Sequence, residues 1–247
     1  MRSSYGCARG PRACRSPRLG RGSPALSQEE SARLARPVGG GASAARTTAD
    51  CGPPSEDDTT AYGAQPDPRL PSLEAYERLP EEEGTRIELV RGRLVREPAP
   101  GMRHAWQCGR IVGRISRYLD EEALGLVLTE MGFILARNPP TVRIPDIAFI
   151  AEANLPPEGI SAGFGRRAPD LAVEIVSPAN ATTEMREKAI EYLAAGARAV
   201  RVIHPRRREV AACRPGAAVR ILTDADVLDG GDVLPGLRTP LEELFWR

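Results

Sequence analysis

The stretch PDLAVEIVSP, residues 169–178, decides the fold of this chain. It is an apolar run of strand length, and a helix is predicted after it from about Thr182 to Ala195, with Gly196 as the C′ residue. The strand-like segment RAVRVIHP, residues 198–205, comes next. Two strands that share a sheet and are joined by a helix form a parallel, right-handed crossover. This crossover predicts an α/β domain with a mixed sheet.

The segments on either side add hairpins and further helices. Upstream, the sequence predicts a short helix after Ser72, a hairpin across Arg91-Gly92, a long helix over residues 103–122, and the strands LVLTEMGFIL (126–135) and VRIPDIAFI (142–150). Downstream, it predicts the hairpin EVAACRPGAAVRIL (209–222) and a closing helix in PLEELFW (240–246). A Pro- and Gly-rich loop of about 18 residues precedes PDLAVEIVSP, and a loop of that length is usually functional or mobile.

The composition divides the chain into two parts. Residues 1–70 are dominated by Arg, Gly, Pro, Ser and Ala without periodicity, so we expect a disordered extension before a globular domain at residues 71–247. A targeting peptide is the less favoured interpretation, because Gly and Pro break an amphipathic helix. No apolar run approaches the roughly 20 residues of a membrane-spanning helix. We therefore expect a cytoplasmic protein without a membrane partner.

Bulk properties exclude several classes of protein. The formal net charge of the 247 residues is +1 and 41% are hydrophobic, which suits one globular domain with extra chain. The five cysteines are scattered and never spaced as CxxC. Neither a disulfide framework nor a zinc site is therefore indicated.

Two carboxylates stand out because each interrupts an apolar strand. Asp146 lies in VRIPDIAFI and Glu174 lies in PDLAVEIVSP. A carboxylate in such a run is costly unless it is paired, so two of them suggest a bound divalent cation. Hard oxygen ligands favour Mg²⁺ or Mn²⁺. The alternative is that each acid meets solvent or an arginine near a strand end and has no chemical role.

Lys188 is the only lysine in the chain. It lies on the predicted helix after Glu174, at the margin of the apolar stripe that includes Tyr192, from which its ammonium could reach the carboxylates. An ammonium, unlike a guanidinium, can lose a proton and can act on a single water molecule. We therefore predict one site formed by Asp146, Glu174 and Lys188.

The order and spacing of these pieces resemble the Uma-two family of restriction-endonuclease-like proteins, a branch of the PD-(D/E)XK nuclease superfamily. The resemblance covers roughly residues 72–245. The matching pieces are IELVRGRLV with Glu88 and Gly92, His104 at the start of the long helix, PDIAFI, PDLAVEIVSP, and the helix positions Glu184, Lys188, Tyr192 and Gly196.

The resemblance implies a restriction-endonuclease-like core with flanking helices, and a Mg²⁺-dependent endonuclease that acts on DNA. Asp146 and Glu174 would hold the metal, and Glu88 would contribute from the first hairpin. Lys188 would be catalytic. The superfamily places its lysine two residues after the acid, where this chain has Val176. Lys188 would then be a replacement supplied by the next helix.

The chain departs from the family pattern at Arg201 and His204, where an aromatic residue and an aspartate are usual. These changes bear on contacts with substrate or partners more than on the metal site. His104 matches a family position but has no evident chemical partner. Asp170, at the start of its strand, ranks below Asp146 as the motif acid.

Several arginines and tryptophans have two interpretations. One narrow face of the long helix carries the arginines Arg103, Arg110, Arg114 and Arg117. They would suit nucleic-acid phosphates, although a solvated polar face is the commoner role of such a stripe. The same alternatives apply to Arg206, Arg207 and Arg208. Trp106 and Trp246 are interpreted as packing residues.

Two other functions stay open from the sequence. A non-cleaving module that binds nucleic acid or protein on the same fold is supported by the modest net charge and by the departures at Arg201 and His204. An RNA-directed nuclease is a third possibility, because recognition of the 2′-hydroxyl is a property of individual contacts that the sequence does not reveal. A homodimer also stays open, since cutting both strands of a duplex requires two active sites or two successive nicks.

Overall fold

The computed structural model describes residues 71–157, 159–160, 163–177 and 182–246. They belong to the second of two units into which the chain divides, Ala44–Arg247. The first unit, and all of the expected extension at residues 1–70, lie outside the described residues. The expected domain from residue 71 onward is the part that can be described.

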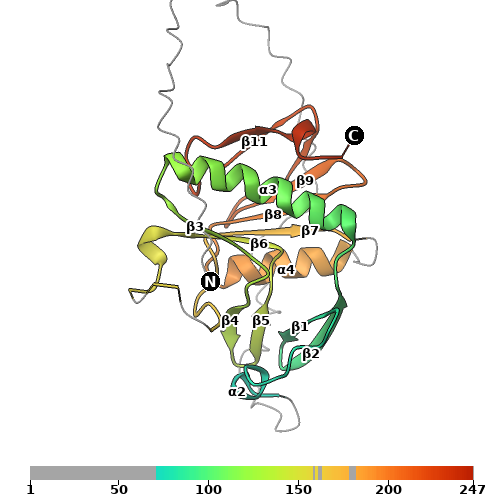
Figure 1. Ribbon diagram of the computed structural model, residues 1–247, viewed down its shortest axis with the longest axis vertical. Helices are drawn as coiled ribbons and strands as arrows, with labels where there is room; N and C mark the ends of the chain where they lie inside the picture. Colours follow the sequence, from blue (N-terminus) through green and yellow to red (C-terminus); the bar gives the residue numbers. More distant parts are fainter. Residues whose placement is uncertain (1–70, 158, 161–162, 178–181, 247) are drawn as a thin grey trace, which may run out of the picture. The chain divides into compact units, whose positions relative to one another are not determined.

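The described part of the chain contains three α-helices, two short 3₁₀ helices and twelve strands (Figure 1). The helical segments are α2 (Leu73–Tyr76), α3 (Met102–Glu121), η2 (Glu152–Asn154), α4 (Thr182–Ala194) and η3 (Leu241–Glu243). The strands are β1 (Thr85–Val90), β2 (Arg93–Pro98), β3 (Gly125–Thr129), β4 (Phe133–Arg137), β5 (Pro140–Arg143), β6 (Ile147–Ala151), β7 (Leu171–Ile175), β8 (Ala199–His204), β9 (Glu209–Cys213), β10 (Arg220–Thr223), β11 (Val227–Asp229) and β12 (Arg238–Pro240).

The larger sheet has six strands in the order β10-β9-β8-β7-β6-β3. Strands β7 and β8 are parallel and are connected through α4, whereas the other neighbours are antiparallel. This confirms the predicted crossover and the mixed sheet. Helix α4 ends before Gly196, whose φ of 102° fits the predicted C′ position.

Helices α3 and α4 lie on opposite sides of this sheet (Figure 1). Alternate residues of β7 explain the layering, because side chains along a strand point to opposite faces. Val173 packs in one core with Ile111 of α3, and Ala172 packs in the other with Ala189 of α4. Glu174 shares the phase of Ala172, so the fold directs its carboxylate toward α4.

A second, four-stranded sheet has the order β2-β1-β5-β4. The segments LVLTEMGFIL and VRIPDIAFI, each predicted as one strand, both divide between the two sheets, and that prediction was wrong in this respect. The pairs Thr129↔Ile147 and Phe133↔Arg143 keep one register, so the four strands form a single bent hairpin. Glu130 has a φ of 53° at the bend, and the opposite strand has Pro145, which cannot donate to a sheet.

The bend places Asp146 just outside β6, not within a strand as predicted. Strands β6 and β7 pair antiparallel with Ile147 opposite Val173. One step further along this register lie Asp146 and Glu174. The two carboxylates therefore come together at one end of the β6-β7 pair, where the larger sheet meets the smaller one.

The loop between β6 and β7 leaves from the other end of that pair. Asp170 accepts hydrogen bonds from the Ala151 amide at 2.9 Å and from Asn154 Nδ2 at 2.8 Å, and thereby fixes the start of the loop. The amide of Ile134 donates to Gly165 O at 2.8 Å, which ties the end of the loop to β4. Asp170 thus has a structural role away from Asp146.

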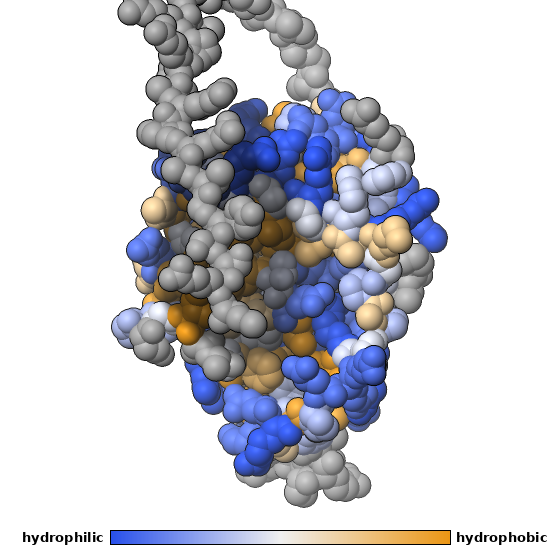
Figure 2. Space-filling model, in the orientation of Figure 1, coloured by the Kyte–Doolittle hydropathy of each residue, from blue (hydrophilic) through white to orange (hydrophobic). Residues whose placement is uncertain are grey.

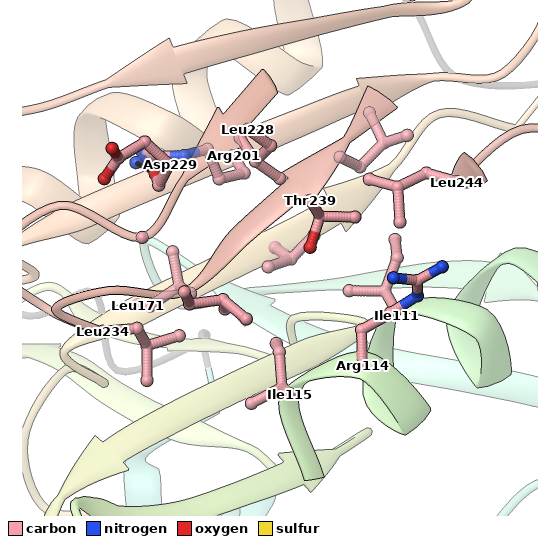
Figure 3. A pocket seen from close by; sticks show the side chains of 14 residues that line it. Ile111, Arg114, Ile115, Leu171, Arg201, Leu228, Asp229, Leu234, Thr239 and Leu244 are labelled. Carbon is pink, nitrogen blue, oxygen red and sulfur yellow. Dashed lines mark hydrogen bonds between the residues drawn. The ribbon is translucent and has the colours of Figure 1, made fainter. Parts of the chain in front are cut away.

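The core under α3 contains a small apolar cavity of about 40 Å³ (Figure 3). Arg201 of β8 borders it and donates to the carbonyls of Val200, Cys213 and Asp229. Burial and the charge of Arg214 lower the pKa of Arg201 to about 10. The departure from the family pattern at Arg201 is therefore accommodated inside the core, with backbone oxygens as partners.

The visible surface is largely hydrophilic, with hydrophobic groups between the polar ones (Figure 2). No helix among the described residues is long and apolar enough to cross a membrane. Few large apolar side chains are exposed in this part of the chain, and one of them is Trp246, whose exposed fraction is 62%.

Candidate functional site

Asp146 is buried at the bend between β5 and β6. Its Oδ1 accepts a hydrogen bond from Arg86 Nη1 at 2.9 Å, its Oδ2 accepts one from the Ile175 amide at 2.6 Å, and His104 Nε2 lies 3.1 Å from Oδ2. Burial works to raise the pKa of Asp146, but the hydrogen bond and charge of His104, the charge of Arg86 and the Ile175 amide hold it below its usual value. Asp146 is therefore an ionised carboxylate fixed against the end of β7.

Glu174 has a different environment, although its carboxylate is equally buried. Its Oε1 accepts a hydrogen bond from the Tyr192 hydroxyl at 2.9 Å, and its Oε2 lies 3.8 Å from Lys188 Nζ. Burial raises the pKa of Glu174 to about 8, with Lys188 opposing the rise and Asp146 and Glu88 adding to it. Glu174 is thus a deeply buried carboxyl group whose nearest cation, Lys188, lies too far away to cancel the effect of burial.

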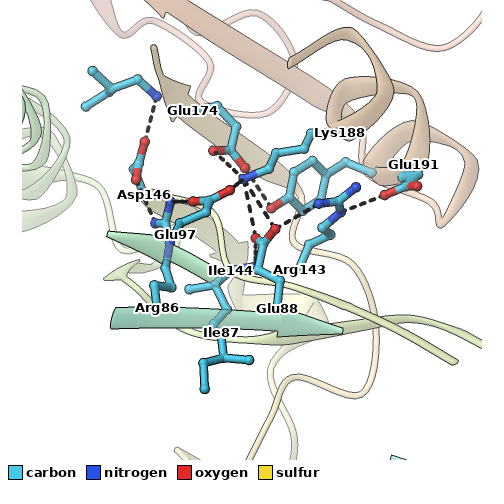
Figure 4. Close-up of polar contacts among 12 residues, drawn as sticks. Arg86, Ile87, Glu88, Glu97, Arg143, Ile144, Asp146, Glu174, Lys188 and Glu191 are labelled. Atoms are coloured by element: carbon cyan, nitrogen blue, oxygen red, sulfur yellow. Dashed lines mark hydrogen bonds and ion pairs between the residues drawn. The ribbon is translucent and has the colours of Figure 1, made fainter. Parts of the chain in front are cut away.

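Lys188 projects from α4 into a group of acids (Figure 4). Its side chain is completely buried, and its Nζ lies 2.9 Å from Glu97 Oε1 and 3.3 Å from Glu88 Oε2. Burial works to lower the pKa of Lys188, but the charges of Glu174, Glu88 and Glu97 raise it above its usual value. Lys188 is therefore a charged ammonium, and the predicted trio does meet in one place.

Glu88, expected as a third metal ligand, is held on several sides at once. Its Oε2 accepts a hydrogen bond from Arg143 Nη1 at 2.8 Å, and its Oε1 accepts one from the Ile144 amide at 2.9 Å. Arg143 in turn donates to Glu191 of α4 at 2.7 Å. Both oxygens of Glu88 are engaged by buried donors, so Glu88 acts here as an anchor between β1, the bend and α4.

Sequence reasoning missed Arg86 and Glu97. Arg86 donates to Glu97 Oε2 as well as to Asp146, so it bridges the hairpin and the bend. The signal was available in the hairpin itself. A two-residue turn at Arg91-Gly92 pairs position 86 with position 97 and sets both on the face that carries Glu88. The register thus predicts an acid and a base beside Glu88.

Four buried carboxylates and three basic side chains make up this network. The carboxylates are Glu88, Glu97, Asp146 and Glu174, and the basic side chains are Arg86, Arg143 and Lys188. At the edge of the network, Glu191 pairs with Arg143 and His104 contacts Asp146. Of the four carboxylates, Glu174 is the one without a close counter-charge, because its nearest cation is Lys188 Nζ at 3.8 Å. The raised pKa of Glu174 comes first from its burial, which the distant Lys188 offsets only in part.

The donor atoms suit a hard divalent cation. Mg²⁺ is commonly held by one or two carboxylates, with water and substrate phosphate completing its shell. Among the described residues, no three His, Cys, Asp or Glu side chains already converge on one point. A cation held by Asp146 and Glu174 would give Glu174 the close positive charge that Lys188, at 3.8 Å, does not provide. Arg86, whose side chain is 21% exposed, is the group that would move aside.

The arginines expected to contact phosphates do not act as a set. Arg110 donates to the Glu243 carbonyl at 3.0 Å, and Arg114 pairs with the Glu243 carboxylate, so these two hold η3 against α3. Arg103 and Arg117 are exposed and have no such contacts among the described residues. The stripe predicted on one face of α3 is thus partly a packing surface.

Comparison with known proteins identifies the family and the fold of this chain. A model of the Uma2 family, described as "Putative restriction endonuclease", matches residues 73–242. No protein with a curated description matches the chain. A crystal structure described as that of "a putative nuclease" from Anabaena variabilis is similar, with a TM-score of 0.64 at 20% sequence identity. The likeness covers 70% of this chain and 96% of the other. The fold is thus restriction-endonuclease-like, and the chain belongs to the Uma2 family.

Proposed function

We propose that this protein is a Mg²⁺-dependent endonuclease, also active with Mn²⁺, that hydrolyses phosphodiester bonds in DNA. The observation that carries the proposal is the meeting of Asp146, Glu174 and Lys188 in one buried network, in which Glu174 has no cation closer than Lys188 Nζ at 3.8 Å. A carboxylate buried without a close counter-charge is costly, and a bound cation would supply that charge.

Asp146 and Glu174 would hold the metal on adjacent strands. When bound, a divalent cation lowers the pKa of water and neutralises charge on phosphoryl oxygens. The protein supplies the positions. The Ile175 amide fixes Asp146, and the Tyr192 hydroxyl fixes one oxygen of Glu174, so the other oxygen is left facing Lys188.

Lys188 would donate a hydrogen bond to the attacking water and stabilise negative charge in the transition state. Because three carboxylates raise its pKa, it stays protonated near neutral pH and does not act as the base. Glu88 and Glu97 are proposed as positioning residues, since they hold the ammonium from the hairpin side.

The test is a cleavage assay with the purified chain on single- and double-stranded DNA and RNA, with Mg²⁺, Mn²⁺ or EDTA. We expect metal-dependent products with DNA and none for Glu174→Ala or Lys188→Met. The matched control is Glu187→Ala, which changes an exposed acid on the same helix. Equal activity of wild type and Glu174→Ala would overturn the proposal, and activity on RNA alone would change its substrate.

A second candidate is a nucleic-acid-binding module that does not cleave. It is favoured by one observation: Arg86 and Lys188 already contact the two proposed metal ligands, and no ready cluster of three ligands exists among the described residues. For this candidate we expect DNA binding in EDTA, unchanged by Lys188→Arg and without cleavage in any metal.

A further inference from the structure

The structure has a second, larger hollow next to the carboxylates. This cleft has a volume of about 660 Å³, within the range of about 300–1,000 Å³ that is common for ligand sites. We call it the Trp246 cleft, after the exposed indole on its wall, and the residues that matter are Arg103, His104, Trp106, Arg206, Arg207 and Trp246. We infer that the Trp246 cleft binds an unpaired nucleotide of a single-stranded nucleic acid beside the proposed cutting site.

The position of the cleft links it to the proposed site. Its walls come from the first turn of α3, the chain after β7, the start of α4, the end of β8 and Trp246. His104 belongs to both places, because its ring lines the cleft while its Nε2 lies 3.1 Å from Asp146. Val176 and Ser177, which follow Glu174 by two and three positions, also line it. A strand bound in the cleft would thus pass directly by the carboxylates.

The charges of the cleft favour an anion. Arg103, Arg206 and Arg207 line it, and no aspartate or glutamate does so among the described residues. These three arginines form no ion pair with a described carboxylate, whereas the neighbouring Arg208 pairs with Asp224 at 2.6 Å. Cations left without partners around a concave surface are typical of phosphate binding. Helix α3 also begins there without a side-chain cap, so its amides and dipole favour the same charge.

The aromatic residues favour a base next to the phosphate. The indoles of Trp106 and Trp246 meet edge to face at 5.0 Å, and Trp246 is 62% exposed. The expectation that both are packing residues is therefore only half right, because most of Trp246 is exposed, beside arginines that have no ion pair within the described part of the chain. Aromatic faces and cations in one groove characterise single-strand binding, since any base can stack there. A duplex would bind less well, because its bases are stacked on one another and are not free to stack on an indole.

The His104 ring lies between the Trp246 cleft and Asp146. With Nε2 directed at Asp146, its Nδ1 is buried and has no hydrogen-bond partner among the described residues. A buried polar atom of this kind is costly unless a ligand or water meets it.

This inference rests on the proposed function for the meaning of the neighbouring site, but binding tests it separately. The probe is a fluorescein-labelled oligothymidylate, compared with its duplex with oligoadenylate, in EDTA so that no cleavage occurs. We expect the full chain to bind the single strand more tightly than the duplex. Trp246→Leu should weaken single-strand binding about 5- to 150-fold, and Trp246→Phe should retain most of it.

The contribution of the cleft arginines to binding is measured separately, from the salt dependence of the affinity. In the variant with both Arg206→Gln and Arg207→Gln, the dependence of log affinity on log salt concentration should become shallower by about 1.4, because each phosphate contact on a single strand contributes about 0.7. Arg93→Gln is the matched control, since Arg93 is an exposed arginine of β2 outside the cleft. The control should leave slope and affinity unchanged.

Some outcomes would overturn the inference and leave the proposed function intact. They are tighter binding of the duplex, an unchanged Trp246→Leu affinity in a variant that unfolds at the wild-type temperature, or equal competition by polyglutamate. The converse result is also distinguishable. Single-strand binding that depends on Trp246, without cleavage in any metal, would support the Trp246 cleft and refute the endonuclease.

Discussion

At the scale of single residues, Lys188 shows how burial strengthens the electrostatic interactions of a charged group. Its ammonium is fully enclosed and contacts three carboxylates, from β1, β2 and β7. A surface lysine with the same partners would contribute little, because water screens exposed ion pairs. Here the three acids depend on one cation, and this dependence leads to the first prediction.

Lys188→Ala should lower the free energy of unfolding by about 3–5 kcal/mol, because it leaves buried carboxylates without their counter-ion. The measurement is urea unfolding followed by circular dichroism. Glu187→Ala, on an exposed position of the same helix, should change the free energy by no more than about 0.5 kcal/mol. If both variants unfold at the same urea concentration as wild type, the ion network does not stabilise the fold.

Glu97 allows a test of the same network by pH. Burial works to raise its pKa, but the charges and hydrogen bonds of Lys188 and Arg86 hold it down at about 2. Because the folded pKa lies below the ordinary value near 4.5, the stabilisation is complete above that value and is lost as the pH falls from about 4.5 toward 2. Wild type should therefore lose stability over this window more steeply than Glu97→Gln. Parallel curves for the two proteins would contradict this.

At the scale of elements, the bend in the hairpin formed by β3-β4 and β5-β6 was not predicted from the sequence. Periodicity and turn residues correctly predicted both helices next to the larger sheet, the crossover through α4 and the hairpins at Gly92 and around residue 216, because these signals are local. The two apolar segments that cross the bend alternate in the same way on both sides of it. Nothing in that alternation tells which sheet a half-strand joins, so each was predicted as one strand.

The candidate site, like the fold, was predicted only in part. Asp146, Glu174 and Lys188 each violate a local pattern, as an acid in an apolar strand or a lone lysine in a chain of arginines, and such violations are visible in sequence. Arg86 and Glu97 violate nothing, because charged residues are common in hairpins. Their place in the site depends on the register of the hairpin and on the contact between Glu97 and Lys188, which are 91 residues apart in sequence.

The contact between the 152–170 loop and β4 gives a prediction at the element scale. A Cβ atom at Gly165 would lie 2.4 Å from the buried Phe133 ring, whereas one at Gly163 would meet nothing within 4 Å. Gly165→Ala should therefore destabilise the domain by about 1–3 kcal/mol through overpacking, and Gly163→Ala should not. Thermal unfolding of the two variants measures the difference. Similar melting temperatures would show that the loop can shift to accommodate the added methyl group at little cost in free energy.

At the scale of the whole molecule, metal binding by the buried carboxylates would be linked to global stability. A ligand that binds only the folded state stabilises it by an amount set by its concentration relative to Kd, about 2.7 kcal/mol at a hundredfold excess. Mg²⁺ should therefore raise the melting temperature of wild type, and the rise should disappear in Asp146→Asn. A rise of the same size in that variant would show that Mg²⁺ binds elsewhere.

The antiparallel arrangement of β6 and β7 has a consequence for how the protein can change. The chain passes Asp146, runs along β6 away from the site, turns through the 152–170 loop at the far end, and returns along β7 to Glu174. The two carboxylates are 28 positions apart in sequence, yet most of the positions between them lie remote from the chemistry. A change in the length of that loop would consequently leave the spacing of the two acids unchanged, because the strand pair sets it, as long as the contacts of Gly165 and Asp170 are kept.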